Sequence, residues 1–365
     1  MFKDRISTRA RWAISIIVAS LAIFGTGFLT SPANALPQPT REYGADRYET
    51  AVQVSHSTFQ PGVPVVFIAT GQNFPDALSG TPAAGKLGGP VLLVQQDSVP
   101  DVVKAELTRL NPAKIVILGG TGAVSSNVAT TLAGYAPTVT REDGADRYET
   151  AVKVSADNFA ANAPLVYVTT GQDFPDALSA GPGVVKAGNK AGPVLLVMQN
   201  SIPDVVKAEL TRLHATQVTV IGGSGAVSDT VKNDLAPYSQ NTVTRIQGAD
   251  RYATSVEVSK ADFAPGTGTV YLATGQNFPD ALAAGPAAAK NGGPVLLVQK
   301  DCMPEGTKAE LTRLNPTQII IVGGTSAVGT GVEQFNVCST TTTFGTTDFG
   351  TFPTFPSTGG TFPTT

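Results

Sequence analysis

The stretch Gly-Ala-Asp-Arg-Tyr-Glu-Thr occupies residues 44–50 and recurs unchanged at residues 144–150. A third copy at residues 248–254 differs only in Ala253, which replaces Glu. Each heptad is followed, in the same order, by Phe-Pro-Asp-Ala-Leu, by Gly-Pro-Val-Leu-Leu-Val and by a Gly-Gly pair. One segment has therefore been built three times, and each copy of about 100 residues is long enough to fold as a unit.

Within each copy, short apolar runs alternate with segments of helical pattern. In the first copy the runs at residues 65–69, 90–94 and 115–118 predict strands that are buried on both faces. Pro75 suits the first turn of a helix, and each heptad opens a further helix. A short strand is expected just before the second and third heptads. This alternation predicts an α/β fold of three tandem Rossmann-like or flavodoxin-like units, each with a parallel sheet.

The N-terminal residues follow the order of a secretory signal peptide. Four basic residues precede an apolar run at residues 12–29, and Ala33-Asn34-Ala35 supplies a small-residue cleavage site. The run is long enough to span a bilayer, so an uncleaved anchor is the alternative. We expect a signal peptide at residues 1–35, a linker at 36–40, repeat units at 41–140, 141–244 and 245–338, and a disordered tail rich in Thr, Phe and Pro at 339–365.

The charge balance argues against nucleic acid. Removal of residues 1–35 takes away four of 25 basic residues and one of 28 acidic residues, which leaves 21 against 27 and a formal net charge of −6. A protein of this balance lacks the basic surface that attracts phosphate backbones. We therefore expect a secreted protein with no nucleic-acid partner and no stable membrane insertion after cleavage.

The cysteines and glycines point to structural roles. Cys302 and Cys338 are the two cysteines of the chain, and export permits a disulfide between them; no His lies nearby to complete a metal site. Gly120-Thr121-Gly122 follows an apolar run, but the third glycine of a dinucleotide fingerprint is missing. We interpret these glycines as tight strand-to-helix turns, and we expect no metal and no cofactor.

Catalytic constellations are hard to assemble from the repeated residues. His56 and His214 occupy different positions in their copies. Paired carboxylates could act as acid and base, but the repeated aspartates stand where helix starts favour an acid. We expect no enzymatic activity and a structural role for Asp46, Asp76, Asp146, Asp176, Asp250 and Asp280.

The arginines after residue 35 fall at three repeated positions. The first two sets are Arg41, Arg47, Arg141, Arg147, Arg245 and Arg251. The third set, Arg109 and its counterparts, stands near a helix end, where the helix dipole favours a cation. For the first two sets two interpretations stay open, because guanidinium groups pair with protein carboxylates such as Asp46 or Asp76 and equally with an anionic ligand.

The combination Arg-x-x-Gly-Ala-Asp-Arg-Tyr-x-Thr, Phe-Pro-Asp-Ala-Leu, Pro-Val-Leu-Leu and Gly-Gly-x-x-Ala-Val resembles the type 2 cell wall binding repeat of Gram-positive surface proteins, over residues 41 to about 338. The resemblance implies three Rossmann-like modules packed as an intrachain pseudo-threefold trimer at the cell wall. It also implies non-covalent attachment to an anionic wall polymer or a peptidoglycan-linked glycan.

The resemblance implies a binding groove that involves arginines and a Pro-Ile-Leu-Leu strand, in which Val replaces Ile here. The resemblance thus adds as ligand-binding candidates Val91, Leu92, Leu93, Val194, Leu195, Leu196, Val295, Leu296 and Leu297. Some members are described as amidases or amidase modifiers, so a wall hydrolase or a modifier of one is an alternative. A structural component of a surface coat is another.

Overall fold

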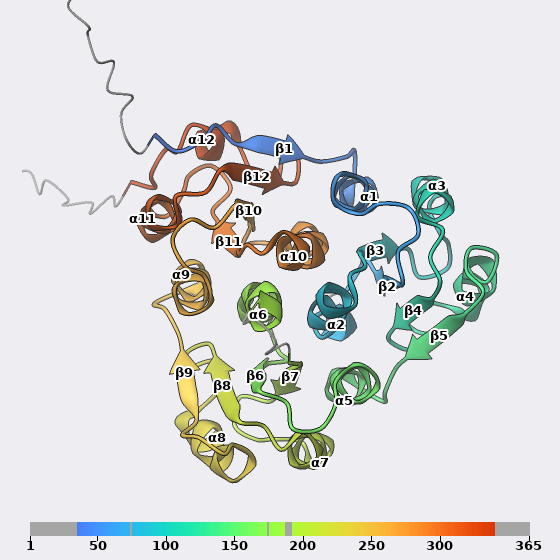
Figure 1. Ribbon diagram of the computed structural model, residues 1–365, viewed down its shortest axis with the longest axis horizontal. Helices are drawn as coiled ribbons and strands as arrows, with labels where there is room; N and C mark the ends of the chain where they lie inside the picture. The colour runs from blue at the N-terminus through green and yellow to red at the C-terminus, as the bar shows by residue number, and fades with distance from the viewer. Residues whose placement is uncertain (1–34, 74, 174, 187–191, 340–365) are drawn as a thin grey trace, which may run out of the picture. The chain divides into compact units, whose positions relative to one another are not determined.

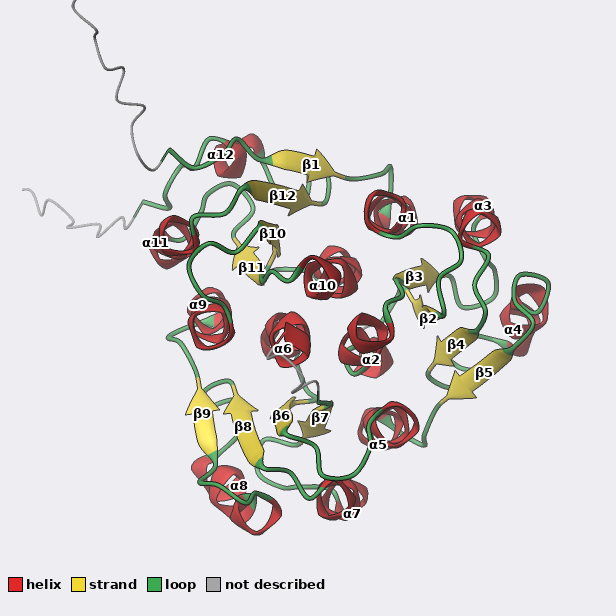
Figure 2. Ribbon diagram, in the orientation of Figure 1, coloured by secondary structure: helices red, strands yellow, loops and turns green. Residues whose placement is uncertain are grey.

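The computed structural model describes residues 35–73, 75–173, 175–186 and 192–339. The predicted tail beyond Ser339 and the predicted leader, except its last residue, lie outside the described residues. The three copies belong to one compact unit, which contains three four-stranded sheets with all strands parallel (Figures 1 and 2). The expected α/β fold with one parallel sheet per copy is therefore confirmed.

The first sheet has the order β3-β2-β4-β5. Its strands are β2 (Val66–Thr70), β3 (Val91–Val94), β4 (Ile115–Leu118) and β5 (Val139–Glu142). The accompanying helices are α1 (Arg47–Thr58), the 3-10 turn η1 (Pro75–Ala77), α2 (Gly80–Leu87), α3 (Asp101–Leu110) and α4 (Ser126–Leu132). Strands β2, β3 and β4 are buried at every residue, because helices cover both faces of a parallel sheet.

The second and third sheets repeat this order. The second has β6 (Leu165–Thr170), β7 (Val194–Val197), β8 (Gln217–Ile221) and β9 (Thr244–Ile246), with α5 (Arg147–Asn158), α6 (Pro175–Lys186), α7 (Asp204–Leu213), α8 (Asp229–Asp234) and the 3-10 turn η2 (Ala236–Tyr238). The third has β10 (Thr269–Thr274), β11 (Val295–Val298) and β12 (Gln318–Val322), with α9 (Arg251–Asp262), α10 (Pro279–Asn291), α11 (Glu305–Leu314) and α12 (Thr330–Glu333).

The third sheet is completed by a strand from the other end of the chain. Strand β1 (Thr40–Glu42) pairs with β12, where Arg41 lies opposite Ile321 (Figure 2). In the same way β5 closes the first sheet and β9 the second, immediately before the next heptad. Each sequence repeat therefore begins with the strand that completes the preceding sheet, and the first repeat closes the last sheet.

Helices α2, α6 and α10 contact one another, one from each copy (Figure 1). Their meeting place is narrow: a Cβ atom on Gly285 would lie 2.3 Å from Cγ2 of Thr81, and one on Gly181 would lie 2.6 Å from the same atom. These residues occupy the same position in their copies, with glycine in two copies and Thr81 in the first. The packing agrees with the pseudo-threefold arrangement that the family resemblance implies.

Side chains also join each copy to the next. The Tyr167 hydroxyl of the second copy donates to Asp262 of the third at 2.8 Å. Lys86 lies 4.5 Å from the ring centroid of Phe159, and Lys290 lies 4.5 Å from that of Phe59. The copies thus meet in a cycle in which the first contacts the second, the second the third, and the third the first.

The expected disulfide joins Cys302 to Cys338, whose Cα atoms are 4.9 Å apart. A single parallel bridge between Met303 and Val337 stands beside it. Together they attach the last described residues to the segment that follows β11. None of the described helices has the length and apolar character needed to cross a membrane.

Candidate functional site

The heptad forms the start of a capped helix. The Asp46 carboxylate accepts hydrogen bonds from the backbone N–H groups of Tyr48 and Glu49, both at 2.9 Å, and the Glu49 carboxylate accepts one from the Ala45 N–H at 2.7 Å. Asp146 makes the corresponding bonds, and Asp250 accepts from the Ala253 N–H at 2.8 Å. Each of these aspartates is the N-cap of its helix. Ala253 provides no carboxylate for the reciprocal bond.

The heptad arginine ties this helix start to the end of a strand. Arg47 donates through Nη1 to the carbonyl of Gly71, directly after β2. Arg147 and Arg251 make the same bond to Gly171 and Gly275. One guanidinium edge is therefore fixed by the backbone of the same copy.

The other face of each heptad arginine turns toward the preceding copy. Arg147 lowers the pKa of Asp76, Arg251 that of Asp176, and Arg47 that of Asp280. Burial has the larger effect and raises the pKa of each of these acids, to about 6 for Asp176 and Asp280. Asp76 and its counterparts thus do more than open a helix, since each faces an arginine across the junction between two copies.

The side chains of Arg41, Arg141 and Arg245 form hydrogen bonds within the protein. The Arg141 guanidinium donates to the carbonyls of Gly119 at 2.5 Å and Val124 at 2.8 Å. Arg245 makes the equivalent bonds to Gly222 and Val227. Arg41 donates to the Gly323 carbonyl at 2.6 Å and pairs with Glu333. These side chains brace the glycine turn of the neighbouring strand, which supports the structural interpretation for this set.

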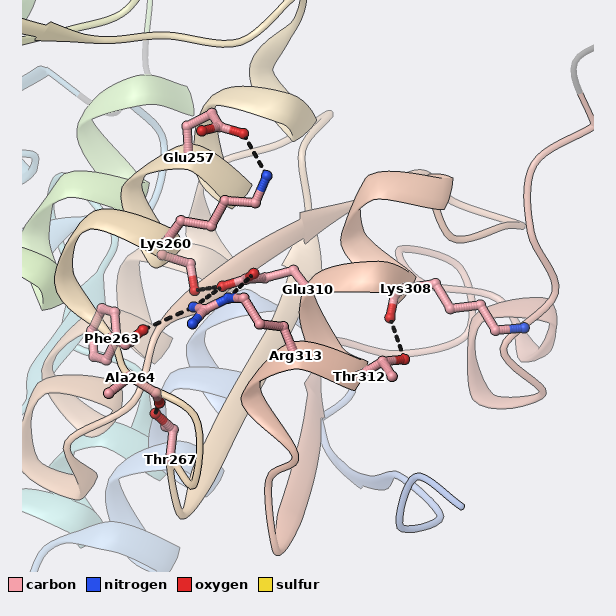
Figure 3. Close-up of polar contacts among 10 residues, drawn as sticks. Glu257, Lys260, Phe263, Ala264, Thr267, Lys308, Glu310, Thr312 and Arg313 are labelled. Carbon is pink, nitrogen blue, oxygen red and sulfur yellow. Dashed lines mark hydrogen bonds and ion pairs between the residues drawn. The ribbon is translucent and has the colours of Figure 1, made fainter. Parts of the chain in front are cut away.

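Each arginine of the third set forms an ion pair with a buried glutamate, which sequence reasoning missed. Arg313 binds Glu310 with two nitrogens at 2.7 Å and also donates to the Phe263 carbonyl at 2.8 Å (Figure 3). The other two copies repeat this arrangement with Glu106 and Glu209. Glu310 is 1% exposed and accepts a further bond from the Ser259 hydroxyl at 2.5 Å. The signal in the sequence is the Glu-x-x-Arg spacing in each copy.

Clefts lie at the junctions between consecutive copies, at the carboxyl ends of the strands. The first, between copies one and two, has a volume of about 550 Å³. It is lined by Thr70, Gln72, Asn73, Asp76, Gln96, Gly120, Gly122, Ala123, Gly144, Ala145, Asp146 and Arg147. In open parallel sheets, ligands bind at this end of the strands.

A second cleft of about 280 Å³ occupies the same place between copies two and three. Its lining includes Asp173, Asp176, Gly223, Asp250 and Arg251. Arg251 reaches across it to Asp173 at 3.3 Å. The corresponding junction between copies three and one is where Arg47 faces Asp280.

The Val-Leu-Leu candidates are buried and lie outside these clefts. All nine side chains lie in edge strands β3, β7 and β11 and are at most 1% exposed. None of them lines the two clefts. In this structure they contribute to the core, whereas polar groups line the two junction clefts.

The glycine turns contribute backbone to these sites. Gly119 has a φ of +87°, and Asp76 Oδ2 lies where a Cβ atom on Gly119 would stand. A side chain at this position would displace the acid. Among the described residues, no group of three or more His, Cys, Asp and Glu side chains is arranged to hold a metal ion.

Fold and site together define a class: three tandem α/β modules that offer polar clefts between modules. The sequence matches the family model of cell wall binding domain 2 (CWB2) at residues 41–129, 141–232 and 245–333. These segments make up most of the chain, which therefore belongs to the CWB2 family, and the resemblance inferred from the repeats is confirmed.

Individual relatives agree with this assignment. N-acetylmuramoyl-L-alanine amidase LytC of Bacillus subtilis is 29% identical over 87% of this chain and 62% of its own length. The amidase enhancer of the same species is 31% identical over 87% of this chain and 42% of its own length. Cwp6 from Clostridium difficile superposes with a TM-score of 0.74 at 26% identity, over 84% of this chain and half of its own. The chain thus spans less than two thirds of these proteins.

Proposed function

We propose that this chain is a secreted surface protein held non-covalently on an anionic polymer of the Gram-positive cell wall. The observation that carries this proposal is the position of Arg47, Arg147 and Arg251, one at each junction between copies. Family membership supports the wall as the partner.

The chemistry of the junctions suits a polymer with both hydroxyl and anionic groups. Arg147 supplies a cation, while Asn73, Gln72, Gln96 and the glycine backbone supply neutral donors and acceptors. The charge of Asp146 is offset by the backbone N–H groups that it caps. Three repeated sites on one chain add their affinities through effective concentration, so weak individual contacts suffice for retention.

The test replaces the three heptad arginines together by glutamine, which keeps an N–H donor for the glycine carbonyl and removes the charge. We expect Arg47→Gln, Arg147→Gln and Arg251→Gln to weaken binding to isolated Gram-positive walls by about tenfold or more. Binding of the wild type should also fall as the salt concentration rises from 0.1 to 1 M, because the screening length drops from about 10 Å to about 3 Å. Cosedimentation with walls measures both effects.

A matched control removes the same charge elsewhere. Lys104, Lys207 and Lys308 occupy equivalent positions on α3, α7 and α11 and do not line the two junction clefts. Their joint replacement by alanine should leave wall binding within about twofold of wild type. Equal losses in both triple variants, with melting temperatures unchanged, would contradict the arginine mechanism.

A wall hydrolase, or a modifier of one, is the second candidate, favoured by the similarity to an amidase and to an amidase enhancer. We propose no catalytic activity for the repeats themselves. A zymogram on cell walls distinguishes the candidates, since lysis by the isolated chain would establish a hydrolase. Concentration-dependent assembly without walls would instead favour a structural coat component.

A further inference from the structure

The three junctions differ at one position, which we term the lip. The lip residue stands two positions after the arginine of the strand that closes each sheet, β1, β5 or β9. It is Tyr43, Asp143 or Gln247, respectively. Each lies beside the second glycine of a Gly-Gly pair. A Cβ atom on Gly324 would lie 3.8 Å from the Tyr43 ring, and one on Gly120 would lie 3.8 Å from Asp143. Gly120 lines the first cleft, so the lip residue Asp143 stands at the margin of that cleft.

At the third junction the lip is an aromatic ring. Tyr43 is 56% exposed, the highest value among the exposed large hydrophobic residues that the structure describes. Its neighbour Gly324 has no side chain that would cover the ring. An exposed ring of this kind offers a flat apolar surface with a polar hydroxyl at its end.

Charge also separates the third junction from the others. The first junction has Asp76, Asp143 and Asp146 around Arg147, and the second has Asp173, Asp176 and Asp250 around Arg251.

At the third junction neutral residues stand at both of the positions that carry Asp143 in the first junction and Asp173 in the second. Asn277 takes the place of Asp173, and Tyr43 takes the place of Asp143. Asp173 pairs with Arg251 at 3.3 Å, so the corresponding asparagine leaves Arg47 with one carboxylate fewer. An anion beside Arg47 therefore meets neither of these two carboxylates, while Glu49, where the second junction has Ala253, is engaged by the Ala45 N–H.

We propose, on the basis of the proposed function, that the third junction is the preferred site for a sugar ring that carries an acidic substituent. The ring stacks on Tyr43, and the acidic group pairs with Arg47, the first residue of α1, four positions after the lip. The first and second junctions bind the same unit more weakly, because Asp143 and Asp173 repel it.

The experiment uses N-acetylglucosamine 6-phosphate as probe and saturation-transfer NMR with the protein lacking residues 1–35. We expect Tyr43→Ala to weaken binding by about three- to tenfold, and Tyr43→Phe to bind as wild type does, because stacking needs the ring and not the hydroxyl. Gln247→Ala, which removes the lip residue of the second junction, should change binding less than twofold.

Three results would overturn the inference: no probe binding to wild type, wild-type affinity in Tyr43→Ala, or equal losses in Tyr43→Ala and Gln247→Ala. These results leave wall binding through the heptad arginines intact. Failure of the wild type to bind walls at all would instead remove the proposed function. The two ideas are therefore separable.

Discussion

Glu142 is a carboxylic acid buried at the end of β5, with 1% of its surface exposed. Burial raises its pKa to about 7, although the Asn158 amide donates to both carboxylate oxygens at 3.1 Å. Its ordinary value is 4.5. The native state therefore holds a proton that the unfolded chain has lost, so stability falls as the pH rises from about 4.5 to about 7.

Glu142→Gln removes the free-energy cost of ionising a buried carboxyl group and keeps an oxygen that accepts a hydrogen bond from Asn158. We expect the variant to match wild type near pH 4 and to be more stable above pH 7, by at most about 3 kcal/mol. Chemical denaturation at the two pH values measures the difference. The exposed Glu257→Gln serves as control, and a stability gain at pH 4 as large as that at pH 8 would refute the assignment.

At this scale the sequence predicted roles that depend on near neighbours and missed those that depend on distant ones. The Asp46 cap was predictable because its partners are two and three residues away. The electrostatic interaction of Arg47 with Asp280 joins residues on different copies, and local pattern contains no information about it. The expectation of a partner at the Asp76 position named the right place in the repeat, since Arg147 acts on Asp76 and Arg47 on its counterpart Asp280, but the sequence did not show that the partner belongs to the preceding copy.

The helices α2, α6 and α10 differ between the copies at the position where they meet. Thr81 on α2 occupies the space that Gly181 and Gly285 leave on α6 and α10. Its hydroxyl has no hydrogen-bond partner in the structure. A methyl group added at Gly285 would meet Thr81 Cγ2 at 2.3 Å, too close for any real contact.

Gly285→Ala should therefore destabilise the protein by about 1 to 3 kcal/mol through overpacking. Thr81→Ala removes the obstructing methyl group and an unpartnered hydroxyl, so alone it should have a small effect and should rescue Gly285→Ala. Thermal unfolding of the two single variants and the double variant measures the coupling. Additive effects would show that the two helices do not touch at these residues.

Element positions followed closely from the sequence. The predicted strand at residues 115–118 coincides with β4, because a short β-branched run between turn signals has few other solutions. The predicted helix at Phe-Pro-Asp-Ala-Leu begins as a 3-10 turn in the first copy and as a regular helix in the others. The sequence predicted a strand before the second and third heptads but could not assign it to a sheet.

The pairing of β1 with β12 organises the whole molecule. Because β1 completes the third sheet, the three copies close on themselves, and each heptad arginine faces the aspartate of the preceding copy. A linear array would leave the third junction, with Tyr43 and Arg47, without its second half. The binding sites that we propose are thus properties of the closed arrangement and not of a single repeat.

The most direct test compares two preparations of the same Gram-positive walls, one intact and one stripped of its anionic polymer. The protein lacking residues 1–35 should cosediment with intact walls and should remain in solution with stripped walls, because the junction arginines then have no anionic partner. Equal binding to both preparations would contradict the account and would identify peptidoglycan itself as the partner.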